Sequence, residues 1–241
     1  MTLPKLMLPT YDLILPIEKT KIKFRPFSVK EQKILLLALE SEDKEFTEEN
    51  IKQILKNCCL SFDVDIDSLS MIDIQFFFIN LRARSVGEVI ESTYRCQKTL
   101  EEGNVCNNSM KVEYNLLEIN LEDKEFDPII KLTSTIGMKM KLPDYLAIKQ
   151  LESTDSIVEV TFDLIISCID YIYDDEEIYK AKEVKKAELR EFVENLSIEQ
   201  FKKIEEFFKT IPKLHKVLNV KCSKCGFNHT IKIEGLENFF G

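Results

Sequence analysis

The sequence predicts an α+β protein that is mostly helical and carries short antiparallel hairpins. Apolar residues recur at helical spacing through residues 28–86 and 143–212, whereas between and after these segments they alternate with polar residues. Hydrophobic residues make up 44% of the 241 residues and charged residues 31%, a balance typical of a globular chain. A chain of this length buries roughly 70–75% of its unfolded surface, so it can form a core without a metal.

Residues 1–27 predict an extended N-terminal arm, followed by a single α+β domain over residues 28–241. The alternating runs in this arm are short because prolines interrupt them, at positions 4, 9, 16 and 26. The stretch "KIKFRPF" predicts an edge strand, since proline is tolerated at sheet edges and not in central strands.

Residues 28–86 predict three helices. Ser28 and Glu31 have the spacing of a capping box, and an apolar run follows them. A second helix is expected from about Thr47 and a third from about Ser70. The helix that follows Ser28 is apolar on many sides, which indicates that it is buried in the protein's own core or against a partner.

The middle of the chain predicts strands. Residues 88–117 contain two alternating stretches joined by a long polar turn, and residues 217–235 contain a second such pair. A further hairpin is expected in "IIKLTSTIGMKMKL", turning near Gly137. We expect the hairpins of residues 88–117 and 217–235 to form one β module.

Residues 143–212 predict the second helical segment. Apolar residues between Ser156 and Asp174 fall at steps of three and four, with acidic residues opposite, which indicates one helix despite the β-branched side chains. Ser197 with Gln200 predicts a capping box for a last helix, which Pro212 ends.

Net charge, hydropathy and the number of cysteines exclude several classes of protein. The 42 acidic and 33 basic residues give a net charge of −9, the wrong sign for neutralising phosphates, so we expect no nucleic-acid partner. No window reaches the roughly 18 uncharged apolar residues of a membrane span, and the first residues lack the pattern of a signal peptide. The sequence therefore predicts a soluble intracellular protein. Seven cysteines, an odd number, favour free or metal-bound thiols over disulfides.

The pair Cys222 and Cys225 has two possible chemistries. A redox CxxC normally has its first thiolate at a helix N-terminus, but the alternation after Gly226 predicts a strand instead. A tight turn with two cysteines followed by glycine suits a zinc knuckle, because glycine can take the positive φ that closes the turn.

Cys96 and Cys106 are the expected partners of Cys222 and Cys225, since each pair lies between two strand-like stretches. Nine residues separate Cys96 from Cys106, and this longer loop costs on the order of 1.3 kcal/mol more to close, against about 10–16 kcal/mol for structural zinc binding. We therefore expect one structural Zn²⁺ ion in a zinc-ribbon-like pair of knuckles formed by these four cysteines. Two alternatives remain: four unligated thiols, or His229 in place of one thiolate. For His229 we expect instead an outward-facing position on a strand.

Recognisable catalytic motifs are absent from the sequence. There is no GxSxG, phosphate loop, HExxH or GxGxxG, and a site with four cysteine ligands has no open position for water or substrate. We therefore expect no enzyme activity and no small-molecule substrate. The alternative is a thiol-disulfide or metal-dependent enzyme that uses Cys222 and Cys225.

Five stretches together resemble the T4-like bacteriophage baseplate protein family. They are "LPKLMLPTYDLILP", "KIKFRPFSVKEQKILLLALES", "IKQILKNC", "INLRARSVGE" and "GLENFFG". The resemblance implies a baseplate hub subunit or hub assembly factor of a contractile tail that contacts other hub or tail proteins. It places the protein in the host cytoplasm during assembly, with the virion baseplate as a second location. Members often carry cysteine knuckles after "RARSVGE" and before "GLENFF", which implies the same four metal ligands.

Overall fold

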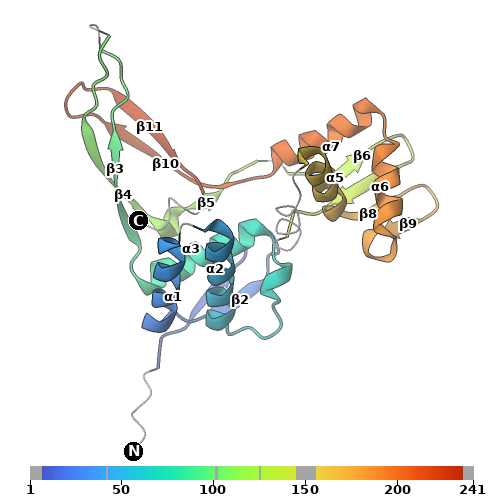
Figure 1. The fold of residues 1–241 in the computed structure, drawn as a ribbon, viewed down its shortest axis with the longest axis horizontal. Coiled ribbons are helices and arrows are strands. Elements are labelled where there is room, and N and C mark those ends of the chain that lie inside the picture. Colours follow the sequence, from blue (N-terminus) through green and yellow to red (C-terminus); the bar gives the residue numbers. More distant parts are fainter. Residues whose placement is uncertain (1–6, 42, 101–102, 125, 145–155, 236–241) are drawn as a thin grey trace, which may run out of the picture. The chain divides into compact units, whose positions relative to one another are not determined.

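The computed structural model describes residues 7–41, 43–100, 103–124, 126–144 and 156–235 (Figure 1). The chain divides into two compact units. Unit 1 consists of Met1–Ile66, Ile72–Glu122 and Lys213–Gly241, and unit 2 of Asp67–Met71 and Asp123–Pro212. This division differs from the one predicted from the sequence, an arm of residues 1–27 followed by a domain of residues 28–241. The predicted division stays a prediction. Fewer than half of the described residues lie in helices, so the expectation of a mostly helical protein was wrong.

The N-terminal residues of unit 1 form an antiparallel hairpin of β1 (Tyr11–Ile14) and β2 (Lys21–Phe24). The predicted edge strand is β2, and β1 is its partner in a two-stranded sheet. Leu15, Ile22 and Phe24 are buried. The region expected to be an extended arm therefore folds back on itself and contributes to the core.

The three helices predicted in residues 28–86 are present as α1 (Val29–Glu40), α2 (Lys44–Cys58) and α3 (Met71–Ser85), with a short turn η1 (Ile66–Ser68) before the last. Phe77 is completely buried at the centre of α3, and its ring packs edge-on against Phe24 with centroids 5.4 Å apart. The buried Asp73 carboxylate accepts hydrogen bonds from the backbone N–H groups of Ile17 and Glu18. Helix α3 thus holds the N-terminal hairpin by packing and by hydrogen bonds.

A buried ion pair at the start of α1 makes stability depend on pH. Burial alone would raise the pKa of Glu31, but hydrogen bonds from Arg25 and Ser28 outweigh it and lower that pKa from 4.5 to about 2. The bond from the Ser28 backbone N–H, 2.7 Å long, is the one that the capping-box spacing predicts.

We expect the Glu31→Gln variant to lose stability in a pH-dependent way. A carboxyl group whose pKa is depressed by folding stabilises the native state above its unfolded pKa, and this contribution disappears as pH falls through the folded pKa. The variant should be about 2–3 kcal/mol less stable than wild type at neutral pH, and the difference should shrink as pH falls from about 4.5 to about 2. Urea titrations at several pH values measure it; a difference that stays constant contradicts the assignment.

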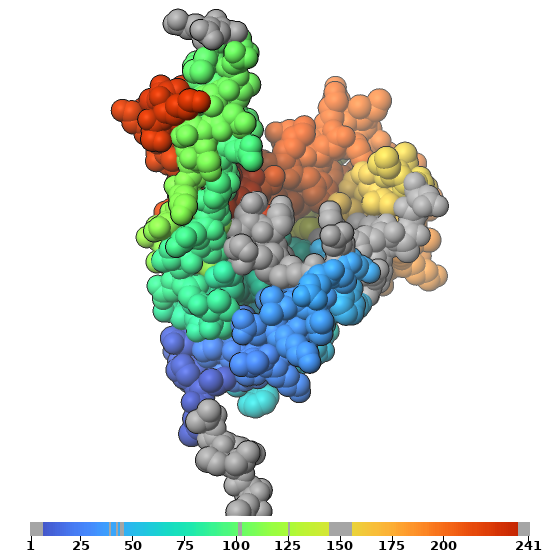
Figure 2. Space-filling model, turned by 60° about the vertical axis from the view of Figure 1, so that its left-hand side comes forward, coloured from blue at the N-terminus to red at the C-terminus, as the bar shows by residue number. Residues whose placement is uncertain are grey.

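The β module of unit 1 consists of two hairpins from distant parts of the chain. Strands β3 (Val89–Arg95) and β4 (Ser109–Asn115) pair antiparallel, as do β10 (Leu214–Lys221) and β11 (Asn228–Ile233), and β5 (Asn120–Leu121) adds to β10. The two hairpins lie side by side (Figures 1 and 2). A short turn, η2 (Leu116–Glu118), follows β4.

A single apolar cluster joins α3 to both hairpins. Ile79 and Ala83 of α3 belong to the same buried cluster as Ile90 and Tyr114 of the first hairpin and Ile233 of the second. The hairpins predicted in residues 88–117 and 217–235 are therefore correctly placed, and their positions at the base are fixed by packing on one helix.

Unit 2 contains a four-stranded antiparallel sheet in the order β6-β7-β8-β9. Its strands are β6 (Ile129–Lys131), β7 (Gly137–Met140), β8 (Ile169–Tyr173) and β9 (Ile178–Lys180), and its helices are α5 (Ile157–Ser167), α6 (Lys186–Glu194) and α7 (Ile198–Thr210), with the turn η3 (Ala181–Glu183) before α6. The predicted hairpin near Gly137 and the capping box of Ser197 and Gln200 are confirmed.

The single helix expected between Ser156 and Asp174 was wrong. Helix α5 ends at Ser167, and the next residues form the central strand β8, paired with β7 and β9. Ile169 and Ile172 are both buried, because an irregularity in the pairing sets them opposite Met140 and Met138 of β7, which share one face of the sheet. The two isoleucines are three residues apart, and in the sequence this spacing continues the helical pattern of the preceding residues. Residues 145–155, where helix was also expected, lie outside the described residues.

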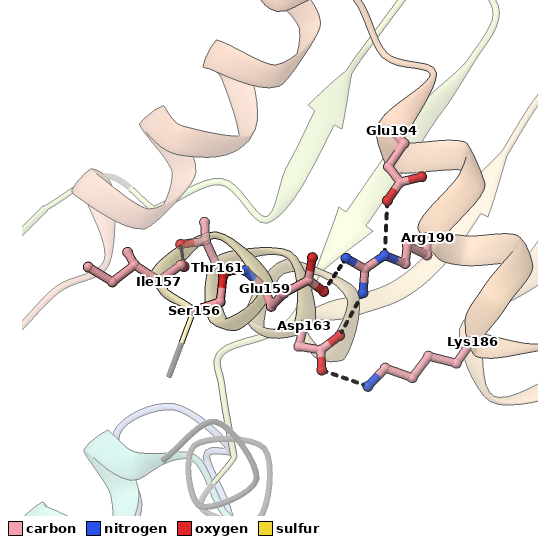
Figure 3. A network of polar contacts seen from close by, with 8 residues as sticks. All are labelled: Ser156, Ile157, Glu159, Thr161, Asp163, Lys186, Arg190 and Glu194. Carbon is pink, nitrogen blue, oxygen red and sulfur yellow. Dashed lines mark hydrogen bonds and ion pairs between the residues drawn. The ribbon is translucent and has the colours of Figure 1, made fainter. Parts of the chain in front are cut away.

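Charged side chains join α5 to α6. Arg190 donates to Glu159 at 2.5 Å across the helices and to Glu194 at 2.9 Å within α6, while Lys186 lies 3.0 Å from Asp163 (Figure 3). The Arg190 pKa is raised by these hydrogen bonds. All of these groups are partly exposed, so solvent screens the pairs and each contributes little to stability. The network orients the two helices more than it stabilises them.

Candidate metal centre

The four cysteines that the sequence singled out lie together in unit 1. Cys96 directly follows β3 and Cys222 directly follows β10. Cys106 and Cys225 stand at the far ends of the two turns, and the four sulfur atoms all lie within 4.8 Å of one another. Cys96, Cys106 and Cys222 are buried and Cys225 is half-buried. Two remote hairpins thus bring two cysteines each to one point.

Backbone hydrogen bonds shape the C-terminal turn. The Gly226 N–H donates to the Cys222 carbonyl at 2.9 Å, and the Cys222 N–H donates to the Phe227 carbonyl at 2.8 Å. Gly226 has φ of +73°, a left-handed conformation that glycine adopts without steric cost. The positive φ expected of this glycine is present, and the turn aims both sulfurs to the same side.

The first turn repeats this pattern. The Asn107 N–H donates to the Cys96 carbonyl at 2.9 Å, and the Cys96 N–H donates to the Asn108 carbonyl at 2.8 Å. Asn107 has φ of +52°, so it takes the place that Gly226 has in the other turn. Asparagine is among the few residues besides glycine that adopt this conformation readily. The two turns are therefore two copies of one knuckle.

The wide spacing in the first knuckle comes from an insertion. Nine residues separate Cys96 from Cys106 and two separate Cys222 from Cys225, so seven residues are extra. They are residues 99–105, closed at their base by the Cys106 N–H donating to the Lys98 carbonyl at 2.9 Å and by a bridge between Thr99 and Val105. Because the insertion closes on itself, it leaves the two sulfurs where an ordinary knuckle has them.

Substitutions at Asn107 test the equivalence of the two turns. Asn107→Val places a β-branched residue at positive φ and should cost about 1–3 kcal/mol of unfolding free energy. Asn107→Gly should change stability by less than about 1 kcal/mol, because glycine is the residue that the other knuckle uses. Thermal unfolding of both variants measures this. Equal losses in the two variants count against a strained turn at this position.

The sulfur positions fit one tetrahedral ion. Four thiolates each about 2.3 Å from a central Zn²⁺ lie roughly 3.8 Å from one another. The Cys96 and Cys225 sulfurs are 3.6 Å apart, and those of Cys106 and Cys222 are 3.9 Å apart. A disulfide needs about 2.05 Å, so these contacts are not covalent pairs. Thiolates are the donors that Zn²⁺ prefers in structural sites.

The pKa values of two cysteines in the cluster are shifted in opposite directions. Hydrogen bonds from the backbone N–H groups of Cys225 and Lys224 lower the pKa of Cys222 to about 6. Burial, reinforced by the neighbouring thiols, raises the pKa of Cys96 to about 12. The four thiols cannot all ionise beside one another unless a cation balances their charge, because like charges at this distance repel strongly.

Two polar side chains contact the cluster: Asn108, which the sequence did not indicate, and His229, which it offered only as a replacement for one thiolate. The Asn108 amide donates to the Cys222 sulfur at 3.5 Å and to the Ser223 hydroxyl at 3.2 Å, so it joins the two knuckles. His229 is half-buried and its Nε2 lies 3.1 Å from the Cys96 sulfur. The expectation of an outward-facing His229 was wrong. The two consecutive asparagines after Cys106, in "CNN", were the available signal for Asn108.

The remaining cysteines lie apart from the cluster. Within the described part of the chain, the four cysteines named above are the one group of three or more His, Cys, Asp or Glu side chains arranged to hold a metal. Cys58 and Cys168 are buried, and burial raises the pKa of each to about 12. They are small core residues, and Cys59 is half-buried.

Residues 8–241 match the protein-family model described as T4 bacteriophage base plate protein. The chain belongs to this family. It is also similar to the baseplate hub assembly protein gp26 of Enterobacteria phage T4, with 24% identity over 223 residues, covering 91% of this chain and 92% of that protein. No solved structure matches the chain. The resemblance seen in the sequence to the baseplate protein family is confirmed.

The match to the baseplate protein family extends over both cysteine pairs, from β3 to β11. No helix in the described ranges is long and apolar enough to span a bilayer. The final stretch "GLENFFG", which contributed to the resemblance, falls mostly outside the described residues.

Proposed function

We propose that this protein is a non-enzymatic baseplate hub subunit or hub assembly factor that acts through contacts with other phage hub or tail proteins. The observation that carries this proposal is the family match over residues 8–241, which includes both units. The similarity to a protein named for baseplate hub assembly supports the hub as the place of action. The site of action is the cytoplasm of the infected host, and the virion baseplate if the protein remains bound.

In this proposal Cys96, Cys106, Cys222 and Cys225 hold one structural Zn²⁺. Such an ion stabilises the two hairpins at their outer ends, where the apolar cluster on α3 does not reach. All four donors are thiolates in a closed arrangement, so the site offers no position for substrate. Its role is to fix the geometry of the β module and of any surface that the module presents.

A thiol-disulfide enzyme that uses Cys222 and Cys225 is the second candidate, favoured by the lowered pKa of Cys222. A redox thiolate must be reached by its substrate, whereas Cys222 is 1% exposed. The turn also leads into β11 instead of a helix. Reduction of insulin disulfides separates the two candidates: the structural proposal expects none, and turnover that disappears in the Cys222→Ser variant supports the enzyme.

Infection with phage carrying a nonsense codon early in the gene tests the assembly role. The proposal expects tails that stop before a complete baseplate, visible by electron microscopy, and rescue by the protein supplied from a plasmid. Normal tails without the protein overturn it. Mass spectrometry of purified virions then distinguishes a resident hub subunit from an assembly factor, because a factor that leaves is absent from the particle.

A further inference from the structure

The polar neighbours of the four sulfurs are arranged reciprocally between the two hairpins. Asn108 directly precedes β4 in the first hairpin, and its amide nitrogen lies 3.5 Å from the Sγ of Cys222 in the second. His229 lies on β11 of the second hairpin, and its Nε2 is 3.1 Å from the Sγ of Cys96 in the first. Each hairpin therefore extends one side chain to the first cysteine of the other.

A metal-bound thiolate determines which atom donates in both contacts. Such a sulfur has no proton, so it can only accept a hydrogen bond. The amide of Asn108 must then present its NH₂ group to Cys222. His229 must carry a hydrogen on Nε2, as one tautomer of the neutral imidazole does. Both side chains are therefore donors to the site.

His229 is not arranged as a fifth ligand. The group of donor atoms that all lie within 4.8 Å of one another contains the four sulfurs and does not include this imidazole. A nitrogen about 2.0 Å and a sulfur about 2.3 Å from the same Zn²⁺ are at most about 4.3 Å apart. The contact of His229 is therefore with the sulfur of Cys96, and not with an ion at the centre of the cluster.

Further contacts hold both donors against the sulfurs. The Asn108 Nδ2 also donates to the Ser223 hydroxyl at 3.2 Å. The His229 ring packs edge-on against Phe227, with centroids 4.8 Å apart. The Lys98 ammonium of the first knuckle lies 5.1 Å from the centroid of the Phe227 ring, a favourable cation–π contact. Each donor is thus oriented by a contact that bridges or supports the two knuckles.

The charge of the centre gives these donors their role. Four thiolates carry twice the charge of one Zn²⁺, so the centre stays negative, and buried charge is costly unless it is hydrogen-bonded. Backbone N–H groups supply part of this, from Lys98 to Cys96 and from Lys224 and Cys225 to Cys222. Cys96 and Cys222 are also the least exposed of the four, at 0% and 1%. The two side-chain donors therefore reach the sulfurs that water reaches least.

We propose that His229 and Asn108 are positioning residues that keep the ion in the site, by donating hydrogen bonds across the knuckles to the thiolates of Cys96 and Cys222. This inference rests on the structural zinc of the proposed function. The donated hydrogens offset part of the excess negative charge and tie the two hairpins together beside the ion. Hydrogen-bond partners of metal ligands typically change metal affinity by about 10–100-fold.

Zinc affinity, measured in competition with a chromophoric zinc chelator, tests the role of His229. His229→Phe should bind zinc about 10-fold or more weakly than wild type, because phenylalanine keeps a ring against Phe227 but has no hydrogen to donate. His229→Gln should stay within about three-fold of wild type, since its amide can place an N–H near the position of Nε2. The contrast between these two variants separates the donated hydrogen from the packing of the ring.

The same measurement tests Asn108. Asn108→Asp should also bind zinc about 10-fold or more weakly, because a carboxylate of the same shape has no hydrogen to donate and adds negative charge beside Cys222. Asn219→Asp is the matched control. It makes the same charge change at an exposed position of β10, where the side-chain oxygen still accepts from Thr230, and it should bind zinc as wild type does.

Substitution of Co²⁺ for zinc gives a spectroscopic signature of the hydrogen bonds. The sulfur-to-cobalt charge-transfer bands move to lower energy when a thiolate loses a donor, because its electrons are then less stabilised. His229→Phe and Asn108→Asp should shift these bands to longer wavelength, and His229→Gln and Asn219→Asp should not. A merely loosened structure would lower the occupancy of the site without this shift.

X-ray absorption on the wild-type protein separates this inference from the zinc site on which it rests. A wild type without zinc, or with fewer than four sulfur neighbours, overturns both. Four sulfur neighbours, together with unchanged affinities and bands in His229→Phe and Asn108→Asp, overturn this inference alone. So does a His229→Gln variant that binds zinc as weakly as His229→Phe while circular dichroism shows both to be folded.

Discussion

Cys222→Ser should lose the metal and destabilise the β module of unit 1. Removing one of four thiolates leaves three buried sulfurs around a poorly held ion, and structural zinc contributes about 10–16 kcal/mol in small peptides. We expect a loss of more than about 4 kcal/mol in the unfolding free energy, a decrease of roughly 10 °C in the midpoint, and less than about a tenth of the wild-type zinc content. Helical content should be largely preserved, since the apolar cluster around the knuckles consists of residues of the two hairpins and their turns and includes none from α1, α2 or α3.

Cys59→Ser is the control for this variant, because Cys59 is a half-buried cysteine outside the cluster. Its metal content should equal that of wild type. Elemental analysis and thermal unfolding on the same preparations give both quantities. If Cys222→Ser keeps its zinc and its melting temperature, the ligand assignment is wrong. A chelator should reproduce the effect of Cys222→Ser in the wild-type protein and have little effect on the variant.

Phe77→Ala should cause the other large loss. The Phe77 side chain is completely buried and packs edge-on against Phe24 of the N-terminal hairpin. Its truncation removes the buried ring and leaves a cavity, which costs about 3–5 kcal/mol. The edge-to-face contact adds about 0.5–1.5 kcal/mol to that range when both rings are present.

Phe62→Ala provides a matched control, since Phe62 is fully exposed at 104% relative accessibility and its truncation should change stability by less than about 0.5 kcal/mol. The chain has no tryptophan, so far-UV circular dichroism in a urea titration is the suitable probe. Similar losses for Phe62→Ala and Phe77→Ala would show that the N-terminal hairpin does not depend on packing against α3.

Much of the fold follows from local signals in the sequence. Ser197 with Gln200 identifies the start of α7 because a capping box uses neighbouring residues alone. The strand β8 could not be identified this way. Its central place in the sheet depends on pairing with β7, which lies far from it in sequence, as well as with the neighbouring β9, and its two buried isoleucines have the spacing of a helix. The pairing of β1 with β2 likewise depends on packing against α3.

The sequence indicated which four cysteines come together, but not which side chains surround them. Cys222, Cys225 and Gly226 form a motif whose spacing alone indicates a knuckle. Cys96 and Cys106 were assigned from the likeness of the flanking strands, because the insertion between them hides the spacing. Asn107 completes the likeness through its positive φ, a property that its residue type permits but does not require. The contact of His229 with Cys96 depends on how the two hairpins meet, which no local pattern shows.

X-ray absorption at the zinc edge, on protein purified without added metal, tests the central claim most directly. The account predicts one zinc per chain with four sulfur neighbours at about 2.3 Å and no nitrogen or oxygen neighbour. A protein that contains no zinc, or a zinc ion with fewer than four sulfur neighbours, contradicts it.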